Sequence, residues 1–477
     1  MKQSDQYIVE ARNLSFEYEG NKIALQQVDF YIRQGSLVFI AGNSGAGKST
    51  LLNIINGLIP EVVDGDLRGT LRIADKEDLK IDERSQIIGN VFQNPRSQFF
   101  TTNTTAELVF AMENFGISKE EMKKRLSDTV KKFHLESLMN RNIYRLSSGE
   151  RQLLALASAM IMNPRVIIFD EPSANLDYGN AMKLRRELLK LKEEGRTIIV
   201  ADHRCFYLKG LISSVLFLEN NTVKHYVTED EYFKSIDGKR AMHLFKEKYP
   251  PREIAKSSTK DVILEDISYK NILCNLDLSF HQNEVTAIVG VNGAGKTTLA
   301  KLLSGVIKPD RGKIKSDGQA LYIMQDADYQ LFGASCLKEL EISQEDETIN
   351  LEALRSLGLY KLKDVHPHSL SGGEKQRLQM AISKVSSNRI IVFDEPTSGL
   401  DKASMQNVVA LIEEMKRKHT IIVISHDYEF IRNIADRIVY LADKTIKDSF
   451  YLEEENVNRL NAIFKEMEKY YDEEIKN

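Results

Sequence analysis

The strongest constraint on the fold is a glycine-rich loop that occurs twice, each time between an apolar run and the start of a helical pattern. Residues 42–50 read Gly-Asn-Ser-Gly-Ala-Gly-Lys-Ser-Thr, and residues 290–298 read Gly-Val-Asn-Gly-Ala-Gly-Lys-Thr-Thr. Glycines let the backbone wrap tightly, so that several N–H groups can point inward at phosphate oxygens. The helix N-terminus adds a favourable field for an anion. Each loop therefore predicts a site for a nucleoside triphosphate.

Two side chains in each loop carry specific expectations. Lys48 and Lys296 would reach the β- and γ-phosphates, while Ser49 and Thr297 would offer a hydroxyl to Mg²⁺. A single match could be a glycine-rich turn without a ligand, but two complete matches after strand-like runs favour a bound triphosphate. The expected contact residues are Gly42, Asn43, Ser44, Gly45, Ala46, Gly47, Lys48, Ser49 and Thr50 in the first copy, and Gly290, Val291, Asn292, Gly293, Ala294, Gly295, Lys296, Thr297 and Thr298 in the second.

Composition narrows the class of protein. A chain of 477 residues is long enough for two to four domains, and 42% hydrophobic with 28% charged residues is ordinary for a water-soluble protein. The net charge of −4 gives no sign of a surface for nucleic acid, so none is expected as a partner. Three widely spaced cysteines indicate neither a disulfide framework nor a zinc site. With no signal peptide and no apolar run of ~20 residues, we expect a cytoplasmic chain whose membrane role depends on partners.

The remaining pattern of the first half also returns in the second half. The second copy is shorter by 24 residues between its loop and its acidic strand end, and then keeps step to within one residue. This spacing indicates a domain duplication, because solenoid repeats are far shorter. We expect a first domain at 1–226, a linker at 227–260, a second domain at 261–448 and a helical tail at 449–477, whose apolar spacing suits an amphipathic helix packed on the second domain.

Paired acids follow two short apolar strands. Asp170-Glu171 comes after residues 166–169, and Asp394-Glu395 comes after residues 390–393. All-apolar strands fit a parallel sheet that is covered on both faces, and ligands bind at the carboxyl ends of such strands. We expect the two aspartates to hold Mg²⁺ through water and the two glutamates to polarise the water that attacks the γ-phosphate.

Histidines and glutamines follow other strands of each copy. His203 and His426 could bond the γ-phosphate or the attacking water, and their matching place in the two copies outweighs the alternative of a structural histidine. Gln93 and Gln325 could reach Mg²⁺ or that water, although a glutamine alone carries almost no signal.

A serine followed by glycines opens another helix in each copy. Residues 146–150 read Leu-Ser-Ser-Gly-Glu and residues 370–374 read Leu-Ser-Gly-Gly-Glu. A simple helix cap explains the serine but not the glycines in both copies. Exposed N–H groups at such a helix end can hold a second face of a triphosphate. The expected contacts are Ser147, Ser148 and Gly149, and Ser371, Gly372 and Gly373.

Taken together, the chain resembles a tandem pair of ATP-binding-cassette (ABC) ATPase domains over residues 7–225 and 260–448. The resemblance implies an α/β fold in which each P-loop NTPase domain has a mostly parallel core sheet, an antiparallel β subdomain and a helical signature subdomain. It also implies an intramolecular pseudo-dimer, in which ATP on Lys48 is closed over by the second signature and ATP on Lys296 by the first. Tyr18 and Tyr269 match the family's adenine-stacking aromatic.

The family roles transfer residue by residue. Glu171 and Glu395 match catalytic glutamates, His203 and His426 match switch histidines, and the glutamines match the lever to the partner. Ser148 departs from the family's usual glycine and could slow the site containing Lys296. Because the other catalytic residues are present, we expect two hydrolytic sites, whose equality Ser148 leaves open.

The segments after the glutamines indicate a branch of the family. Residues 93–100 and 325–332 share the pattern Q-x-x-x-x-Q-[FL]-F, which resembles energy-coupling-factor (ECF) importers of vitamins and transition metals. In that group a membrane T component docks beside the glutamines and a small S component binds the solute, so the chain would lie peripherally on the cytoplasmic face of the membrane. Two alternatives stay open: a fused sugar-importer ATPase, or a soluble twin-cassette translation factor acting on ribosomes.

Overall fold

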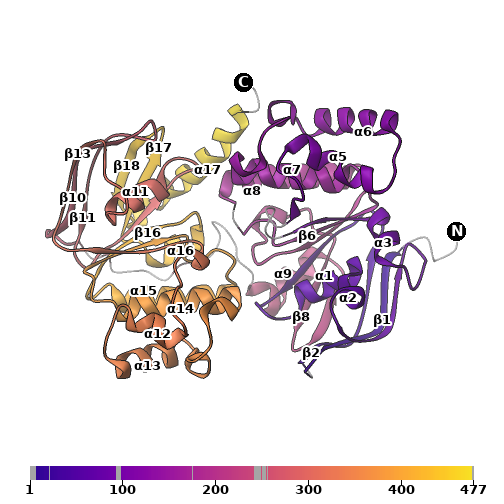
Figure 1. Cartoon of the computed structure of the whole chain (residues 1–477), viewed down its shortest axis with the longest axis horizontal. Helices are drawn as coiled ribbons and strands as arrows, with labels where there is room; N and C mark the ends of the chain where they lie inside the picture. The colour runs from indigo at the N-terminus through magenta and orange to yellow at the C-terminus, as the bar shows by residue number, and fades with distance from the viewer. Residues whose placement is uncertain are drawn as a thin grey trace. The chain divides into compact units, whose positions relative to one another are not determined.

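The computed structural model describes residues 7–20, 22–92, 98–174, 176–240, 249, 254 and 256–474. The chain divides into two units, one of residues 1–176 with 180–242 and one of residues 177–179 with 243–477. Each unit holds a six-stranded sheet and a separate three-stranded antiparallel sheet, coloured from indigo to yellow along the chain in Figure 1. The predicted α/β fold with a mostly parallel core sheet and an antiparallel β subdomain is therefore confirmed.

The first unit orders its large sheet β5-β6-β7-β3-β8-β9, and only the β8–β9 pair is antiparallel. Its small sheet has the order β2-β1-β4. The strands are β1 (Tyr7–Tyr18), β2 (Lys22–Arg33), β3 (Leu37–Gly42), β4 (Gly65–Ile73), β5 (Ile88–Val91), β6 (Val166–Asp170), β7 (Thr197–Ala201), β8 (Ser214–Glu219) and β9 (Thr222–Tyr226). The α-helices are α1 (Lys48–Asn56), α2 (Leu58–Glu61), α3 (Ile81–Ile87), α5 (Thr104–Asn114), α6 (Lys119–Lys132), α7 (Ser148–Met160), α8 (Tyr178–Glu193), α9 (Glu229–Lys234) and α10 (Ile236–Lys239).

The second unit repeats this topology with the order β14-β15-β16-β12-β17-β18, and its small sheet is β11-β10-β13. The strands are β10 (Lys260–Tyr269), β11 (Leu273–His281), β12 (Val285–Val289), β13 (Arg311–Ser316), β14 (Ala320–Ile323), β15 (Ile390–Asp394), β16 (Thr420–Ile424), β17 (Arg437–Ala442) and β18 (Thr445–Tyr451). The α-helices are α11 (Lys296–Leu303), α12 (Cys336–Glu341), α13 (Glu347–Ser356), α14 (Gly372–Val385), α15 (Lys402–Met415), α16 (Tyr428–Ile434) and α17 (Val457–Glu474).

Both faces of the large sheets are covered, which explains their unbroken apolar strands. In the first unit, Phe39 and Phe169 belong to one core cluster, while Val38 and Ile168 belong to another. Successive residues of a strand point to opposite faces, so the two clusters lie on opposite sides of the sheet. Figure 1 shows the helical group α5, α6 and α7 apart from the small sheet of β1 and β2.

Residues 229–239, which the sequence places in the linker, form α9 and α10 and belong to the first unit. Tyr232 of α9 is buried in the same core cluster as Phe217 and Tyr226. The aromatic contact fixes this segment to the sheet, and a polar sequence pattern gives little sign of it.

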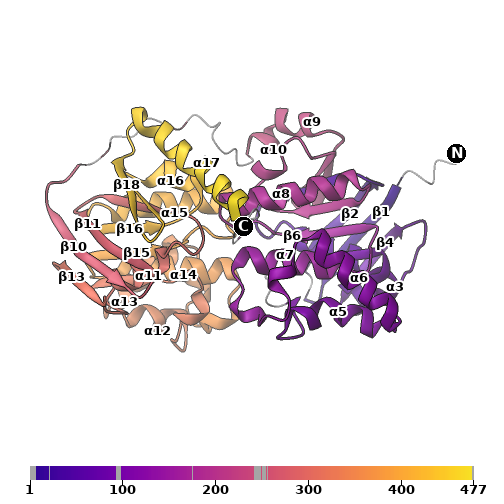
Figure 2. The ribbon, with the colours of Figure 1, turned by 90° about the horizontal axis from the view of Figure 1, so that it is seen from above.

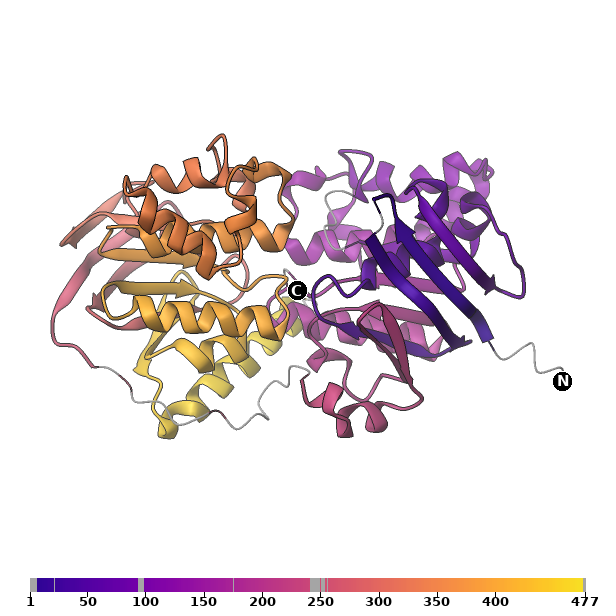
Figure 3. The same cartoon turned by 90° about the horizontal axis from the view of Figure 1, so that it is seen from below.

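The C-terminal helix α17 packs on the second unit. Its residues Leu460, Ile463, Phe464 and Met467 are buried in one cluster with Ile431 of α16 and residues of β12 and β17. Figure 2 shows α17 beside α16 and β18. In Figure 3, the yellow α17 and the orange helices of residues 336–385 lie on opposite sides of this unit's strands.

Candidate nucleotide sites

Both glycine-rich loops adopt the backbone that the sequence predicts for a phosphate cradle. Gly45 and Gly47 have φ values of 75° and 97°, and Gly293 and Gly295 have values of 85° and 102°. Side chains with a Cβ are strained in this left-handed region, so glycine is required. Gly47 and Gly295 directly precede α1 and α11, so each loop opens onto a helix N-terminus.

The loop lysines are buried inside the cradles. Nζ of Lys296 donates to the carbonyl oxygens of Gly290 and Val291 at 2.8 and 3.0 Å. Nζ of Lys48 likewise donates to the carbonyl oxygens of Gly42 and Asn43 at 2.9 and 3.1 Å. Among the residues described, Lys296 makes no ion pair, and it is only 7% exposed. A buried ammonium held by carbonyl oxygens alone suits a phosphate as its counter-ion.

The first strand-end acid lies beside the loop hydroxyl. Oγ of Ser49 is 3.3 Å from Oδ1 of Asp170, as expected for two groups that share a magnesium ion. Burial raises the pKa of Asp170 to about 6, and the nearby charge of Glu171 adds to this rise. A cation beside this carboxylate would offset the free-energy cost of burying its charge. Ser49 and Asp170 are therefore suited to bind Mg²⁺ together.

The second acid has one more partner than the first. Oδ2 of Asp394 accepts hydrogen bonds of 2.8 Å from Thr297 and from Tyr322 of β14. Asn90 of β5 holds the corresponding place in the first unit, because it pairs with Ile168 two residues before the acid. The side-chain oxygen of Asn90 is buried without a hydrogen-bond partner. Tyr322 was missed by sequence reasoning, since nothing in a short apolar strand marks its hydroxyl.

Each glutamate meets its histidine at the sheet edge. Oε1 of Glu171 is 3.1 Å from Nε2 of His203, which in turn lies 3.3 Å from Nζ of Lys48. In the second unit, Oε1 of Glu395 is 2.8 Å from Nδ1 of His426. The structure thus brings together the predicted base, histidine and lysine of the first site.

The two glutamates share an unusual backbone. Glu171 and Glu395 have φ values of 46° and 52°, in the left-handed region. Their N–H groups donate to Ala201 and Ile424, the last residues of the neighbouring strands. This backbone conformation changes the direction of the chain directly after the strand and costs about 1–2 kcal/mol. Such strain is common at functional sites.

The structure describes one of the two predicted glutamines. Gln325 lies two residues after the end of β14 and is exposed, whereas Gln93 lies outside the described residues. The second glutamines of the repeated pattern instead have a clear role. Oε1 of Gln98 accepts from the N–H of Phe92 at 3.1 Å, and Oε1 of Gln330 accepts from Met324 at 2.9 Å. Their repeated spacing was the available signal.

The signature serines cap their helices. Ser147 precedes α7 and forms a capping box with Glu150, and Ser371 precedes α14 and forms one with Glu374. The side chain of Ser148 is outside the described part. Gly149 has no room for a side chain, because an added Cβ would lie 2.5 Å from Oδ1 of Asn180. At Gly372, by contrast, an added Cβ would meet no atom within 4 Å.

The two aromatic residues expected to stack on adenine lie at the ends of β1 and β10. The hydroxyl of Tyr18 is 2.7 Å from Oγ1 of Thr50, so Tyr18 is tied to the phosphate loop. Nζ of Lys270 lies 5.1 Å from the ring centre of Tyr269, within the range of a cation–π contact.

The chain has two glycine-rich phosphate loops, and each unit carries an acid at the end of a strand in its mostly parallel sheet. These features define a class of protein, the tandem P-loop ATPases. The family model described as ABC transporter matches residues 25–174 and 273–398, so the chain belongs to the ABC family. A Treponema denticola protein named as an ABC transporter ATP-binding protein is 38% identical, with 96% of this chain and 100% of the relative covered. A Methanosarcina acetivorans protein of the same name is 30% identical, with coverages of 93% and 90%.

Solved structures share the fold over nearly the whole chain. An archaeal ABCE1 in a ribosome-bound model with Pelota has a TM-score of 0.70 at 22% identity, covering 94% of this chain and 80% of that one. An RNase-L inhibitor has a TM-score of 0.65 at 23% identity, with coverages of 94% and 92%. At these identities the similarity shows the fold alone. The chain is an ABC ATPase.

Proposed function

We propose that this ATPase is the energy-coupling subunit of an ECF-type importer. It would couple ATP binding and hydrolysis to uptake of a vitamin, metal ion or similar micronutrient through membrane T and S components. No helix in the described part of the chain is long and apolar enough to cross a membrane. The proposal therefore places the chain peripherally on the cytoplasmic face, where its membrane partners carry the solute.

The repeated loop after each first glutamine carries this proposal. Gln98 and Gln330 are anchored to the core sheets, since their amide groups also donate to the carbonyl oxygens of Asn90 and Tyr322 at 3.2 and 2.9 Å. Gln330 accepts a further bond of 3.0 Å from Gln379 of α14. In the second unit, Gln330 is thus bonded to both β14 and α14, so this segment can transmit movement of one to the other.

Each of these loops presents a phenylalanine to solvent. Phe100 and Phe332 are 75% and 77% exposed, although both are large apolar side chains. A buried glutamate holds each one in place, because Oε2 of Glu107 accepts from the N–H of Phe100 at 3.1 Å and Oε2 of Glu339 accepts from that of Phe332 at 2.7 Å. Two matching apolar projections with rigid supports suit docking of a partner's apolar helix.

The ATP sites are proposed to work as composites. ATP and Mg²⁺ at Lys48, Ser49 and Asp170 would be completed by the second signature helix, and those at the second loop by the first. Glu171 and Glu395 would position the attacking water, with His203 and His426 on the γ-phosphate. Closure and reopening would then shift the membrane partner between states through differential contacts.

The test is copurification of the tagged chain with a polytopic membrane protein from its native host. Phe100→Asp and Phe332→Asp together should abolish copurification while leaving basal ATP hydrolysis intact. The reason is that burying an unpaired carboxylate in an apolar interface costs free energy. Ile236→Asp is the matched control, since Ile236 is 72% exposed in the first unit. Equal recovery of the membrane protein with all variants would contradict the docking surface.

The same experiment separates the alternatives. Salt-sensitive cosedimentation with ribosomes, without any membrane protein, would support the translation factor instead. Mass spectrometry of the copurified subunits would distinguish an ECF importer, which has a small solute-binding S component, from a sugar importer.

A further inference from the structure

A cavity lies in the first unit at the edge of the sheet that faces away from the phosphate loop. It has a volume of about 50 Å³ and is lined by Tyr31, Arg33, Ser36, Ser213, Ser214, His225 and Val227. Its walls come from the end of β2, the start of β3 and the β8–β9 hairpin. Ser36 and Ser214 lie at the amino ends of parallel strands, whereas Asp170 is the last residue of β6 and Lys48 follows the carboxyl end of β3. The cavity is thus separate from the nucleotide site.

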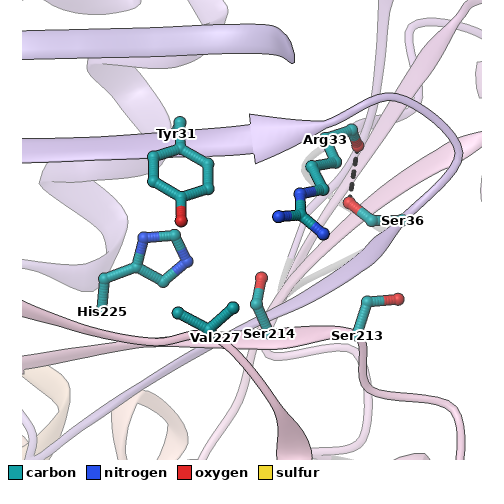
Figure 4. A pocket seen from close by; sticks show the side chains of 7 residues that line it. All are labelled: Tyr31, Arg33, Ser36, Ser213, Ser214, His225 and Val227. Atoms are coloured by element: carbon teal, nitrogen blue, oxygen red, sulfur yellow. Dashed lines mark hydrogen bonds between the residues drawn. The ribbon is translucent and has the colours of Figure 1, made fainter. Parts of the chain in front are cut away.

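Three polar groups converge on this cavity without partners. Figure 4 shows the guanidinium of Arg33 and the hydroxyl of Ser214 directed toward the same space, with His225 beside them. Among the described residues, neither Arg33 nor Ser214 makes a side-chain hydrogen bond or an ion pair, and Nε2 of His225 is buried without a hydrogen-bond partner. Arg33 is exposed and Ser214 half-buried, so solvent reaches both groups, whereas the buried Nε2 of His225 lacks the partner that buried polar atoms normally have.

The second unit shows what occupies the corresponding place there. The N–H of Leu37, at the start of β3, donates to Oγ of Ser213 at 3.1 Å. The N–H of Val285, at the start of β12, donates to a carboxylate oxygen of Asp436 at 2.8 Å. Ser36 and Glu284 each directly precede these strands. Two acids of the second unit thus correspond to two serines of the first.

Those acids lie beside basic side chains. Lys416 contacts Oδ1 of Asp436 at 2.7 Å, and His281 lies 3.3 Å from Oε2 of Glu284. Arg437 is held by Oγ of Ser449, at 2.9 Å. The second unit therefore has a buried ion pair between Lys416 and Asp436 here, while burial raises the pKa of Glu284 to about 7 and lowers that of His281.

No carboxylate lines the cavity of the first unit. Its titratable lining groups are Tyr31, Arg33 and His225. The nearest acid with an effect on His225 is Glu231, whose carboxylate accepts from the N–H of Val227 at 2.9 Å. Burial lowers the pKa of His225, Glu231 opposes this, and the positive charge of Arg33 lowers it further. The site thus has donors and a cation but lacks a matching anion.

We propose that this cavity binds a small oxyanion, such as phosphate or a carboxylate group, between Arg33, Ser214 and His225. The anion supplies in the first unit the acceptor oxygens that the carboxyl groups of Glu284 and Asp436 supply in the second. It joins β2 to the β8–β9 hairpin at an edge remote from ATP, so its binding is independent of the proposed transport role.

The test follows the imidazole signals of the full chain by NMR after labelling of its histidines. Saturating Mg-ADP keeps both phosphate loops occupied, and His225→Gln assigns the signal. Inorganic phosphate and acetate are titrated in separate arms. We expect a saturable shift of the His225 signal and a rise in its pKa, because a nearby anion favours the imidazolium. A response to phosphate only, to acetate only or to both supports the site and defines the shape of the anion.

Two variants make the result decisive. Arg33→Met should abolish the response, while Arg12→Met, an exposed arginine on β1, should retain it. Ser36→Glu places the second unit's carboxylate in the cavity and should raise the pKa of His225 without any added anion. No saturable shift in the wild-type chain, or an unchanged response in Arg33→Met, would overturn the proposal. If Arg33→Met does not fold, an unchanged anion response in Ser36→Glu would do the same.

Discussion

The hydroxyl of Tyr322 donates a hydrogen bond of 2.8 Å to Oδ2 of Asp394, which lies 72 positions further along the chain. Burial raises the pKa of Asp394 and the charge of Glu395 adds to it, whereas the bonds from Tyr322 and Thr297 lower it. Burial and the charge of Asp394 raise the pKa of Tyr322, so its hydroxyl remains a donor. The first site has Asn90 in this place, so the two sites differ at a second position besides Ser148.

Tyr322→Phe should therefore weaken the second site at low pH. Without this hydroxyl the pKa of Asp394 rises further, since a hydrogen bond to a charged group contributes about 1.5–3 kcal/mol. The acidic limb of the ATPase pH profile should move to higher pH, when measured in a Glu171→Gln background that leaves the second site active. Tyr360→Phe, which alters a partly exposed tyrosine of the same unit, is the control. An unchanged profile would remove Tyr322 from the site.

Asp170 should make the nucleotide-free chain less stable as pH rises. Its folded pKa of about 6 exceeds its ordinary value of 3.8, so the folded state binds more protons between these values. Stability from this group is therefore lost as pH rises through that window. Bound Mg²⁺ should reduce this loss, because a cation favours the charged carboxylate and lowers its pKa.

Asp170→Asn tests this balance directly. In urea denaturation without nucleotide at pH 7.5, the variant should gain roughly 1–3 kcal/mol, while losing hydrolysis at the first site. At pH 4 the gain should vanish, because the wild-type carboxyl is then protonated in the fold. Asp64→Asn, at an exposed position, should change neither quantity. A loss of stability for Asp170→Asn at pH 7.5 would refute the stated cost of burying this charge.

Glu171→Gln and Glu395→Gln should each disable one site only. Removing a group that activates or positions water slows its own site by about 10²–10⁴-fold. Each single variant should keep measurable ATP turnover from the other site, and the double variant should keep almost none. If one change abolishes all hydrolysis and the other has no effect, the view of two hydrolytic sites is wrong.

Gly290→Ala should damage the second phosphate loop. An added Cβ would lie 2.2 Å from the carbonyl oxygen of Leu441, and a backbone oxygen cannot move aside cheaply. We expect one ATP bound per chain in place of two, by calorimetric titration in the presence of EDTA. Gly318→Ala adds a Cβ that meets its nearest neighbour at 3.6 Å and should keep both sites. Two full-affinity sites in Gly290→Ala would contradict the tight packing of this loop.

Sequence reasoning reached the phosphate loops, the strand-end acids and the capping serines because each is a local arrangement. Glycine at positive φ, the helix that follows it and the acid directly after an apolar strand are all fixed by neighbouring residues. The duplication strengthened these predictions, since a chance match would not recur at the same spacing in the second half of the chain. The linker prediction failed at residues 229–239, where buried Tyr232 ties a polar segment to the core.

The sequence by itself determined that the chain holds two P-loop ATPase domains, and it placed Lys48 and Lys296 in the phosphate loops and Glu171 and Glu395 directly after core strands. Only the tertiary structure decided which side chains from distant parts of the chain contact the site residues, and which of them share a cavity. Tyr322 reaches Asp394, and Arg33 shares a cavity with His225, because sheet pairing brings distant strands side by side. Residue spacing along the chain does not encode such pairing, since strand order is fixed by packing of the whole sheet.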